Sequence, residues 1–238
     1  MYRTAILVDA GFFLKRYAHI SPGIDHSDPQ LAADTLYDLA IKHLSRVNRS
    51  GNVVTYERDC DLYRLFVYDS PPLEKRIHSP VERKAINLAI SPEAVFRNTF
   101  HKALLQKRKV ALRLGRLAEK TGTWKIKQET QKRLVSEIGQ PLTLADADFA
   151  LDIGQKGVDM RIGLDIASIS FKKQVDRIVL VAGDSDFVPA AKLARREGID
   201  FILDPLRLKV SDDLLEHIDG LRSTSRNPNR QPINQNSP

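Results

Sequence analysis

Two aspartates that stand two residues apart, directly after an apolar run, have the clearest potential for chemistry in this sequence. The run is Ile178–Ala182, and the polar turn Gly183-Asp184-Ser185-Asp186 follows it. A short apolar run rich in β-branched side chains predicts a strand buried on both faces, so both acids stand at its carboxyl end. Ligands bind at that edge of open parallel sheets. Asp also suits a helix N-cap, so capping is the simpler interpretation of both side chains.

Two further aspartates, Asp9 and Asp159, occupy positions from which they can reach the same edge. Asp9 ends the apolar run Ala5–Val8, which predicts a first buried strand. Asp9 and Asp184 should therefore project from one edge, because parallel strands end on the same side of a sheet. Asp159 precedes a predicted helix and joins them if the segment before it crosses over that edge. Helix capping is again the simpler interpretation of Asp159.

The helix after Asp159 also carries Asp165, whose role the sequence leaves open. Ile162, Ile166 and Ile169 recur at the spacing of a helix that packs on a sheet. Each residue turns the helix by about 100°, which places Asp165 about 120° away from Asp159. We therefore rank Asp159 above Asp165 as a site residue and interpret Asp165 as a solvated acid.

Positive charge is concentrated in one segment of the chain. The 238 residues carry a net charge of +7, yet residues 97–133 contain twelve Lys or Arg and only two Glu. A focused basic region indicates a polyanionic partner, although a solvated helix face is the plainer interpretation. The candidate RNA contacts in this segment are Arg113, Arg116, Lys125 and Lys127.

The acids and the basic segment together predict one kind of chemistry. Clustered carboxylates repel one another and are tolerated when they hold a hard cation such as Mg²⁺ or Mn²⁺. A basic region beside them suits a phosphate-bearing polymer, so the combination predicts metal-assisted hydrolysis of phosphodiesters. Asp9, Asp159 and Asp184 would hold the metal, and Asp186 would complete the site or orient the attacking water. Ser185 and Lys156 are candidate phosphate contacts, with a turn residue and a solvated lysine as the alternatives.

Strands that alternate with helices must position these residues, and this alternation predicts an α/β fold with a mostly parallel sheet flanked by helices. The expected strands cover residues 2–9, 62–69, 110–117, 178–182 and 199–203. The expected helices cover residues 12–17, 29–47, 92–109, 128–138, 160–173, 187–197 and 212–221, and residues 48–61 are expected to form a loop. His43 lies on the apolar face of its helix and is interpreted as a packed side chain rather than a ligand.

The sequence predicts a single domain over residues 1–222, in which residues 72–152 form a basic insertion. Residues 223–238 are rich in Ser, Asn, Pro and Gln and are expected to be a disordered tail. The one cysteine, Cys60, excludes an intramolecular disulfide and a cysteine-rich zinc site. Without a signal peptide or an apolar run of about 20 residues, a cytoplasmic protein with no membrane contact is expected.

Three motifs carry a family resemblance: Leu7-Val8-Asp9, then Lys156-Gly157-Val158-Asp159, then Val181-Ala182-Gly183-Asp184-Ser185-Asp186-Phe187. Together they resemble the NYN domain family of PIN-like ribonucleases, over roughly residues 2–69 and 155–221. The resemblance implies a Rossmann-like fold, a divalent metal held by aspartates, and endonucleolytic cleavage of RNA. It points to Asp9, Asp159, Asp184 and Asp186. Many members have asparagine three residues after the first aspartate, where this chain has Phe12.

Our leading hypothesis is a Mg²⁺- or Mn²⁺-dependent ribonuclease, and the alternative is a non-catalytic RNA-binding or regulatory module that keeps the fold. A phosphatase of the haloacid dehalogenase type would need a second aspartate at position 11, which is Gly11. A receiver domain would need an acid pair near Asp9, which the sequence lacks. The sequence leaves open whether DNA is also cut and whether the chain forms homo-oligomers.

Overall fold

The central feature of the fold is a parallel sheet of six strands in the order β14-β13-β12-β1-β4-β7. The structure is a computed structural model that describes residues 2–50, 53–118, 122–137 and 143–225. The strands are β1 (Tyr2–Asp9), β4 (Cys60–Asp69), β7 (Val110–Leu114), β12 (Arg177–Val181), β13 (Asp200–Asp204) and β14 (Gly220–Leu221). The predicted α/β class with a mostly parallel sheet is confirmed.

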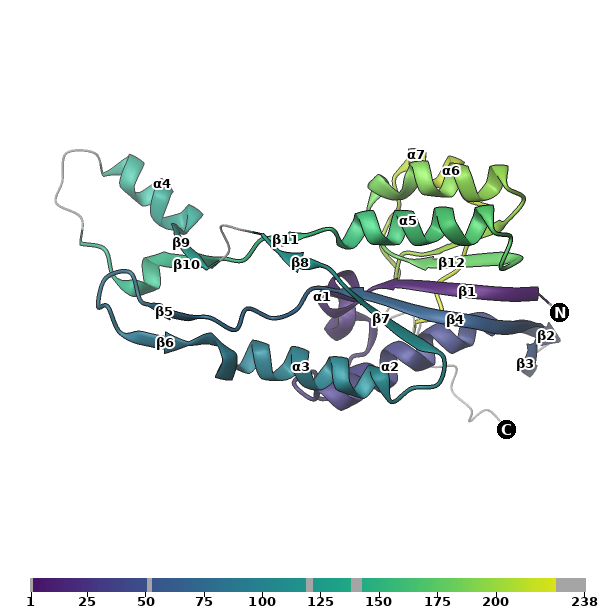
Figure 1. Cartoon of the computed structure of the whole chain (residues 1–238), viewed down its shortest axis with the longest axis horizontal. Helices are drawn as coiled ribbons and strands as arrows, with labels where there is room; N and C mark the ends of the chain where they lie inside the picture. The colour runs from purple at the N-terminus through teal and green to yellow at the C-terminus, as the bar shows by residue number, and fades with distance from the viewer. Residues whose placement is uncertain (1, 51–52, 119–121, 138–142, 226–238) are drawn as a thin grey trace, which may run out of the picture.

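Helices cover both faces of this sheet (Figure 1). One layer consists of α1 (Ala10–Ile20), α2 (Pro29–Ile41), the short η1 (Lys42–Leu44) and α3 (Pro92–Leu105). The other layer consists of α5 (Val158–Phe171), η4 (Ser185–Phe187), α6 (Val188–Arg196) and α7 (Asp212–Glu216). No helix in the described ranges combines the length and apolar composition that a membrane span requires.

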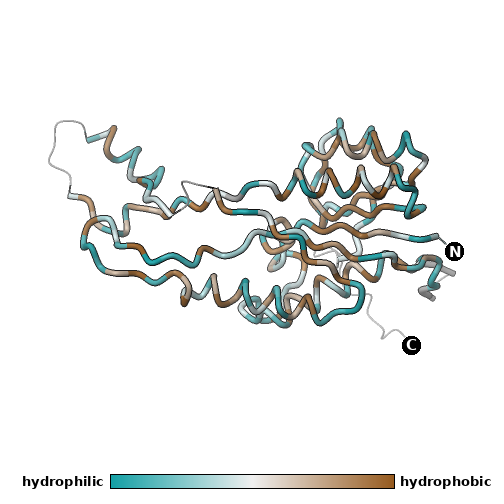
Figure 2. Tube along the Cα trace, in the orientation of Figure 1, coloured by the Kyte–Doolittle hydropathy of each residue, from teal (hydrophilic) through white to brown (hydrophobic). Residues whose placement is uncertain are grey.

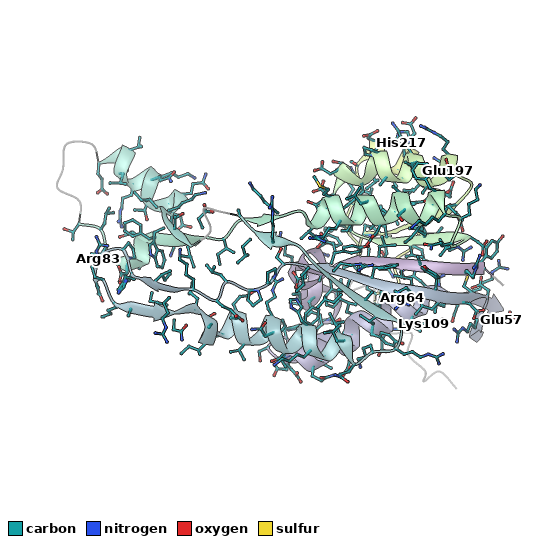
Figure 3. All side chains as sticks on the ribbon, in the orientation of Figure 1. Glu57, Arg64, Arg83, Lys109, Glu197 and His217 are labelled. Atoms are coloured by element: carbon teal, nitrogen blue, oxygen red, sulfur yellow. The ribbon has the colours of Figure 1, made fainter. Side chains whose placement is uncertain are left out.

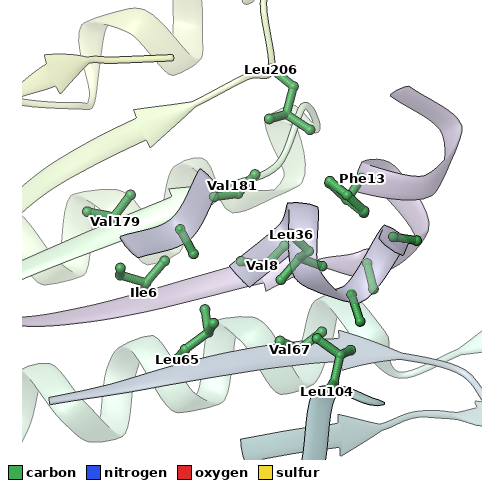
Figure 4. Packing of buried hydrophobic residues seen from close by; sticks show 14 of the residues in the cluster. Ile6, Val8, Phe13, Leu36, Leu65, Val67, Leu104, Val179, Val181 and Leu206 are labelled. Atoms are coloured by element: carbon green, nitrogen blue, oxygen red, sulfur yellow. The ribbon is translucent and has the colours of Figure 1, made fainter. Parts of the chain in front are cut away.

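The central strand β1 supplies both hydrophobic cores, because successive side chains of a strand point to opposite faces. Ile6 and Val8 pack toward α1 and α2, where Phe13 and Leu36 lie (Figure 4). Ala5 and Leu7 join the core beneath α5 and α6. Figure 2 shows brown, hydrophobic stretches along the central strands. The near-continuous apolar run of β1 therefore reflects burial on both faces, as the sequence predicted.

An elongated arm extends from the carboxyl edge of the sheet (Figure 1). The arm consists of the described residues in the ranges 73–90, 116–118, 122–137 and 143–156. Its elements are β5 (Arg76–His78), β6 (Ala85–Asn87), η2 (Leu88–Ile90), β8 (Arg116–Leu117), β9 (Thr123–Ile126), α4 (Gln128–Ser136), η3 (Asp146–Asp148), β10 (Phe149–Asp152) and β11 (Gln155–Lys156). Arg83 marks its far end in Figure 3. The chain enters the arm after β4 and after β7, so the arm grows from the edge at which these strands end.

Short antiparallel pairs hold the arm together: β5 with β6, β9 with β10, and β8 with β11 at its base. The indole Nε1 of Trp124 donates to the carbonyl oxygen of His78 at 2.8 Å and links two of these pairs. Oδ1 of Asp146 accepts hydrogen bonds from the backbone N–H groups of Val81 and Glu82. Asp146 therefore stabilises the fold of the arm through these two hydrogen bonds.

The region predicted as one insertion, residues 72–152, contains parts of the core. β7 pairs in parallel with β4 in the main sheet, and α3 packs in the core beside α2 through Phe100 and Leu104. The arm is thus two excursions from the sheet, before and after the α3–β7 unit.

Several predicted boundaries are wrong in the described residues; for example, the helix expected over 92–109 ends at Leu105, and the strand expected over 110–117 ends at Leu114. The helix expected over 29–47 ends at Ile41 and is followed by η1. The loop expected over 48–61 is mostly strand. There β2 (Ser45–Ser50) pairs with β3 (Val53–Arg58), and β4 begins at Cys60. The dipeptide Gly51-Asn52 stands in the sequence between the two segments that pair, which is a typical hairpin signal. The polar composition of these segments led to the prediction of a loop instead. The helix expected over 212–221 ends at Glu216, and Gly220–Leu221 joins the sheet as an edge strand.

The first three residues of the tail expected over 223–238 pack against the domain. Ser225 is buried, the side chain of Arg207 donates to backbone carbonyls of Ser223 and Ser225, and Thr224 N–H donates to Asp204. Residues 226–238 lie outside the described residues.

Asp204, at the end of β13, forms a buried ion pair with His43: Nε2 of His43 lies 2.9 Å from Oδ2 of Asp204, and each side chain is 1% exposed. The histidine is therefore packed, as predicted. Burial by itself raises the pKa of Asp204, but the hydrogen bond and charge of His43 and the N–H of Leu206 outweigh burial and hold the pKa below its usual value.

We expect Asp204→Ala to lower the free energy of unfolding by about 3–5 kcal/mol at pH 7, because it leaves His43 buried without its partner. The stabilisation by Asp204 should be present above the unfolded-state pKa of about 3.9 and be lost as the pH falls through the lower folded-state pKa. Urea unfolding from pH 7 down to pH 2 measures this. Exposed Asp61→Ala is the control and should change little. A deficit in Asp204→Ala that does not shrink in acid would contradict the ionised pair.

Candidate functional site

The pairing of β1 with β12 brings the candidate acids to one edge. The two strands are parallel neighbours in which Val8 lies opposite Val181, so Asp9 and the turn that contains Asp184 follow directly at the same edge. Their convergence follows from strand register rather than from any contact between the acids.

A pocket of about 660 Å³ opens at this edge, and three of the four predicted aspartates line it. They come from three segments: the end of β1, the first turn of α5 and the turn after β12. The lining residues are Asp9, Gly11, Phe12, Leu14, Lys15, Arg97, Ile153, Gly157, Val158, Asp159 and Asp184. Since Gly157, Val158 and Asp159 follow β11, the segment before Asp159 crosses to this edge, as the sequence argument required.

Asp9 has two roles at once. Its Oδ1 accepts a hydrogen bond from the N–H of Phe12 at 3.0 Å and thereby caps α1. It also lines the pocket. Burial raises its pKa, the charges of Asp159 and Asp69 raise it further, and the hydrogen bond from Phe12 opposes them. Burial and the neighbouring acids therefore destabilise the charged form of this carboxylate.

Asp159 stands in the first turn of α5 but is not its cap, because Gly157 is the N-cap residue in a left-handed conformation with φ of 80°. Burial raises the pKa of Asp159, followed by the negative charges of Asp184 and then Asp186. Asp186 therefore acts electrostatically on the same site although it does not line the pocket.

The residue after β7 packs closely against the segment that leads into α5. A Cβ on Gly115 would lie 2.9 Å from the carbonyl oxygen of Lys156.

Asp184 and Asp186 are exposed and belong to η4 and its cap. Oδ1 of Asp184 accepts a hydrogen bond from the N–H of Asp186 at 3.1 Å, so the capping interpretation also holds for Asp184. Gly183 leaves room for a neighbour, since a Cβ there would lie 2.5 Å from Cε2 of Phe12. Phe12, the departure from the asparagine of many NYN members, thus packs over Gly183 beside the pocket.

The other predicted contacts are spread along the edge and the arm. Ser185 and Lys156 are exposed next to Asp184 and Asp159, and Arg116 is exposed at the base of the arm. Lys125 in β9 and Lys127, the residue after β9, are both exposed. Two of these basic side chains form ion pairs with acids from elsewhere in the chain. Lys125 lies 2.7 Å from Asp152, and Arg113 lies 3.4 Å from Asp165.

Asp165 does not line the pocket. Its carboxylate accepts a hydrogen bond from the hydroxyl of Tyr68 at 2.7 Å and pairs with Arg113, so the ranking of Asp159 above Asp165 agrees with their surroundings. Asp165 is half-buried and partnered rather than a solvated acid.

Sequence reasoning missed two cations of the pocket, Lys15 and Arg97. Arg97 counted only as part of the basic segment. It is held by Asp69, whose carboxylate also lies 2.8 Å from Nε2 of His101. Asp69 ends a predicted strand, and this position could have marked it as a candidate site residue. Its partners Arg97 and His101, however, are 28 and 32 residues away in sequence, so the sequence did not show that Asp69 holds Arg97.

The donor set of the pocket suits a hard divalent cation. Asp9, Asp159 and Asp184 offer carboxylate oxygens, and none of them forms an ion pair with a described residue. The repulsion that raises the pKa of Asp159 is what a cation would relieve.

The described residues contain one group of three potential metal ligands whose ligand atoms all lie within 4.8 Å of one another. They are the exposed Asp213 and Glu216 on the short α7 and the half-buried His217 that follows it. The ligand atoms of Asp9, Asp159 and Asp184 do not all lie within 4.8 Å of one another. His217 lies well away from the arm side of the sheet in Figure 3.

Comparison with known proteins gives one family match and one similar solved structure. The model of the NYN domain matches residues 83–217. That range includes Asp159, Asp184 and Asp186. It also includes residues 83–154, which the sequence motifs had left out of the resemblance, and it omits the first strand with Asp9.

A crystal structure of a protein of unknown function from Vibrio parahaemolyticus is similar at 16% identity and a TM-score of 0.40, covering 92% of this chain and 91% of that one. No curated protein matches significantly. NYN membership indicates a nuclease-like function related to RNA, in a superfamily that usually uses divalent metals. The family match spans more than half of the sequence, and the chain belongs to the NYN domain family of the PIN-like superfamily.

Proposed function

We propose that this protein is a divalent-metal-dependent endoribonuclease that uses Mg²⁺ or Mn²⁺. The observation that carries the proposal is the convergence of Asp9, Asp159 and Asp184, from three separate segments, on one pocket in which no described residue neutralises them through an ion pair. Three carboxylates kept together at a cost in charge repulsion are more easily explained by a cation ligand than by the stability of the fold.

In this proposal the chain's own residues divide the work. Asp9, Asp159 and Asp184 hold the cation, directly or through water, and Asp186 completes the site or orients the attacking water. A bound divalent cation would lower the pKa of a water molecule and stabilise charge on the phosphate. Because Asp9 caps α1 and Asp184 caps η4, backbone hydrogen bonds restrict both carboxylates before any ligand arrives.

The arm supplies the proposed path for RNA. It begins at the same edge as the pocket, and its exposed bases Arg116, Lys125 and Lys127 lie along it, with Arg113 at the end of β7 (Figure 1). Lys156 and Ser185 stand next to the aspartates and are proposed contacts for neighbouring phosphates.

A non-catalytic RNA-binding module remains the second candidate. The specific observation in its favour is that Asp9 and Asp184 both serve the fold through capping hydrogen bonds. A protein that had lost catalysis would therefore still keep them.

Metal binding can be tested without activity. We expect Asp159→Asn to have an equal or higher melting temperature than the wild type without metal, because it removes repulsion from Asp184 and Asp186. Mn²⁺ at about 100 times its Kd should raise the wild-type melting temperature by roughly 5–10 °C, and that of Asp159→Asn by much less. Asp165→Asn, outside the pocket, is the matched control and should keep the increment. An equal increment in Asp159→Asn would place the metal elsewhere.

Catalysis is tested by Asp184→Asn, which retains the size of the side chain and much of its capping capacity. We expect cleavage of single-stranded RNA in Mn²⁺ or Mg²⁺ to fall by about 10²-fold or more, the scale on which the loss of a transition-state stabiliser is felt. RNA binding should persist or tighten, because a negative charge near the phosphates is gone. Chelator should abolish wild-type cleavage. Wild-type protein that binds RNA but cuts no substrate with either metal would favour the binding module.

The role of the arm is tested by the salt dependence of binding. The double variant Lys125→Ala/Lys127→Ala should lower the slope of log affinity against log salt by about 0.7 for Lys127, which forms no ion pair with a described residue, and by about 0.7 more if RNA displaces Asp152 from Lys125, since each phosphate contact of a single strand contributes about 0.7. Lys192→Ala/Arg196→Ala removes two exposed charges from α6, away from the arm, and should leave the slope unchanged (Figure 1). Equal slopes for the wild type and the arm variant would assign these lysines to solvated surface.

A further inference from the structure

Arg97 is a cation that lines the acidic pocket yet is tied to acids outside it. It lies on α3, and its side chain is 15% exposed. Nη1 donates to Oδ1 of Asp69, and Nε donates to Glu93 one helical turn earlier at 2.9 Å. No described residue accepts a hydrogen bond from Nη2. The guanidinium thus has two donors fixed and retains donor capacity at the pocket.

Asp69 is built as an anchor for this guanidinium. It is 1% exposed, and its Oδ1 also accepts the N–H of Ser70 at 2.8 Å. Its Oδ2 lies 2.8 Å from Nε2 of His101, itself buried on α3. Burial alone raises the pKa of Asp69, but the His101 hydrogen bond and the Arg97 charge outweigh burial and hold it below the usual value. Asp69 therefore stays charged, and Arg97 is fixed between α3 and the end of β4.

The arrangement differs from an ion pair that only stabilises the fold. Arg97 lies on the same pocket as Asp9, Asp159 and Asp184, but its ion-pair partners among the described residues are Asp69 and Glu93. A planar guanidinium held on one side and open on the other is suited to phosphate oxygens, to which it makes charge-assisted, directional hydrogen bonds. The carboxylates alone repel phosphate, so a substrate phosphate entering the pocket needs a positive counterpart.

We propose that Arg97 binds a non-bridging oxygen of the RNA phosphodiester that enters the aspartate pocket, and that Asp69 and His101 position it. The inference rests on the proposed function and deepens it, because it names the side chain that holds the reacting phosphate. The pocket then has an acidic side formed by three aspartates and a basic side formed by Arg97, with Lys15 nearby on α1.

The test measures RNA binding by variants of Arg97 in an Asp184→Asn background, with Mn²⁺ or with chelator. The probe is a single-stranded oligoribonucleotide, either with all phosphates or with one uncharged methylphosphonate linkage at successive positions. We expect Arg97→Ala to weaken binding of the all-phosphate RNA by about tenfold, the scale of one charge-assisted hydrogen bond, and to lower the salt slope by about 0.7. At one linkage position, neutralising the phosphate should abolish the difference between Arg97 and Ala.

Matched variants separate binding from folding. Lys102→Ala removes an exposed charge from the same helix and should change affinity less than twofold. Arg97→Lys keeps a charge for Asp69 and should bind with intermediate affinity, so it carries the test if Arg97→Ala does not fold. Asp69→Asn should weaken binding to the same extent as Arg97→Ala, and the double variant should add nothing further, as expected when one residue acts through the other.

Two results would overturn the inference: folded Arg97→Ala that binds the all-phosphate RNA like the wild type, or a loss that is the same whichever linkage is neutral. The first means that Arg97 touches no phosphate, and the second that its effect is a general one on the fold. Failure of the nuclease proposal looks different. A wild-type protein that never cuts RNA but shows the linkage-specific Arg97 effect would refute catalysis and leave the phosphate contact standing.

Discussion

The parallel pairing of β1 with β12 is the constraint on which the site depends. It brings the end of the first strand beside a strand that starts more than 160 residues later, with Val8 opposite Val181. The acids that follow both strands then share one edge, whatever their own preferences. The sheet is buried on both faces, so a shift of its register would exchange the side chains of the two cores and disrupt the packing of each. The position of the acids is therefore as strongly specified as the core itself.

Charge compensation across the fold decides which bases remain available to a polyanion. The basic segment has few acids within it, yet several of its members meet acids from elsewhere. Lys107 pairs with Asp34, Lys125 with Asp152, and Arg133 with Asp148. The excess of positive charge counted from the sequence is therefore an upper limit on the positive charge that is available to bind RNA. The pocket has the opposite arrangement, because its aspartates lack ion-pair partners among the described residues while Arg97 is anchored by an acid outside it.

Structural and chemical roles coincide in the same aspartates rather than exclude each other. Asp9 caps α1 and Asp184 caps η4, and each also faces the pocket. A carboxylate fixed by a backbone N–H is already oriented for a ligand, so capping contributes to preorganisation. Asp146 and Asp148 show the other outcome, since their hydrogen bonds serve only the turns and helix of the arm.

The sequence by itself determined the elements whose signal is local: the apolar runs of the main strands, the period of α5 and the position of an acid at each strand end. These were sufficient to predict the fold class and to select Asp9, Asp159 and Asp184. The tertiary structure alone decided what depends on partners distant in sequence. The β2–β3 hairpin, the order of strands that places the arm at the carboxyl edge, and the contacts of Arg97 with Asp69 belong to this group. Periodicity reports the burial of a residue's own face, whereas an ion pair depends on which distant side chain packing brings within about 3 Å.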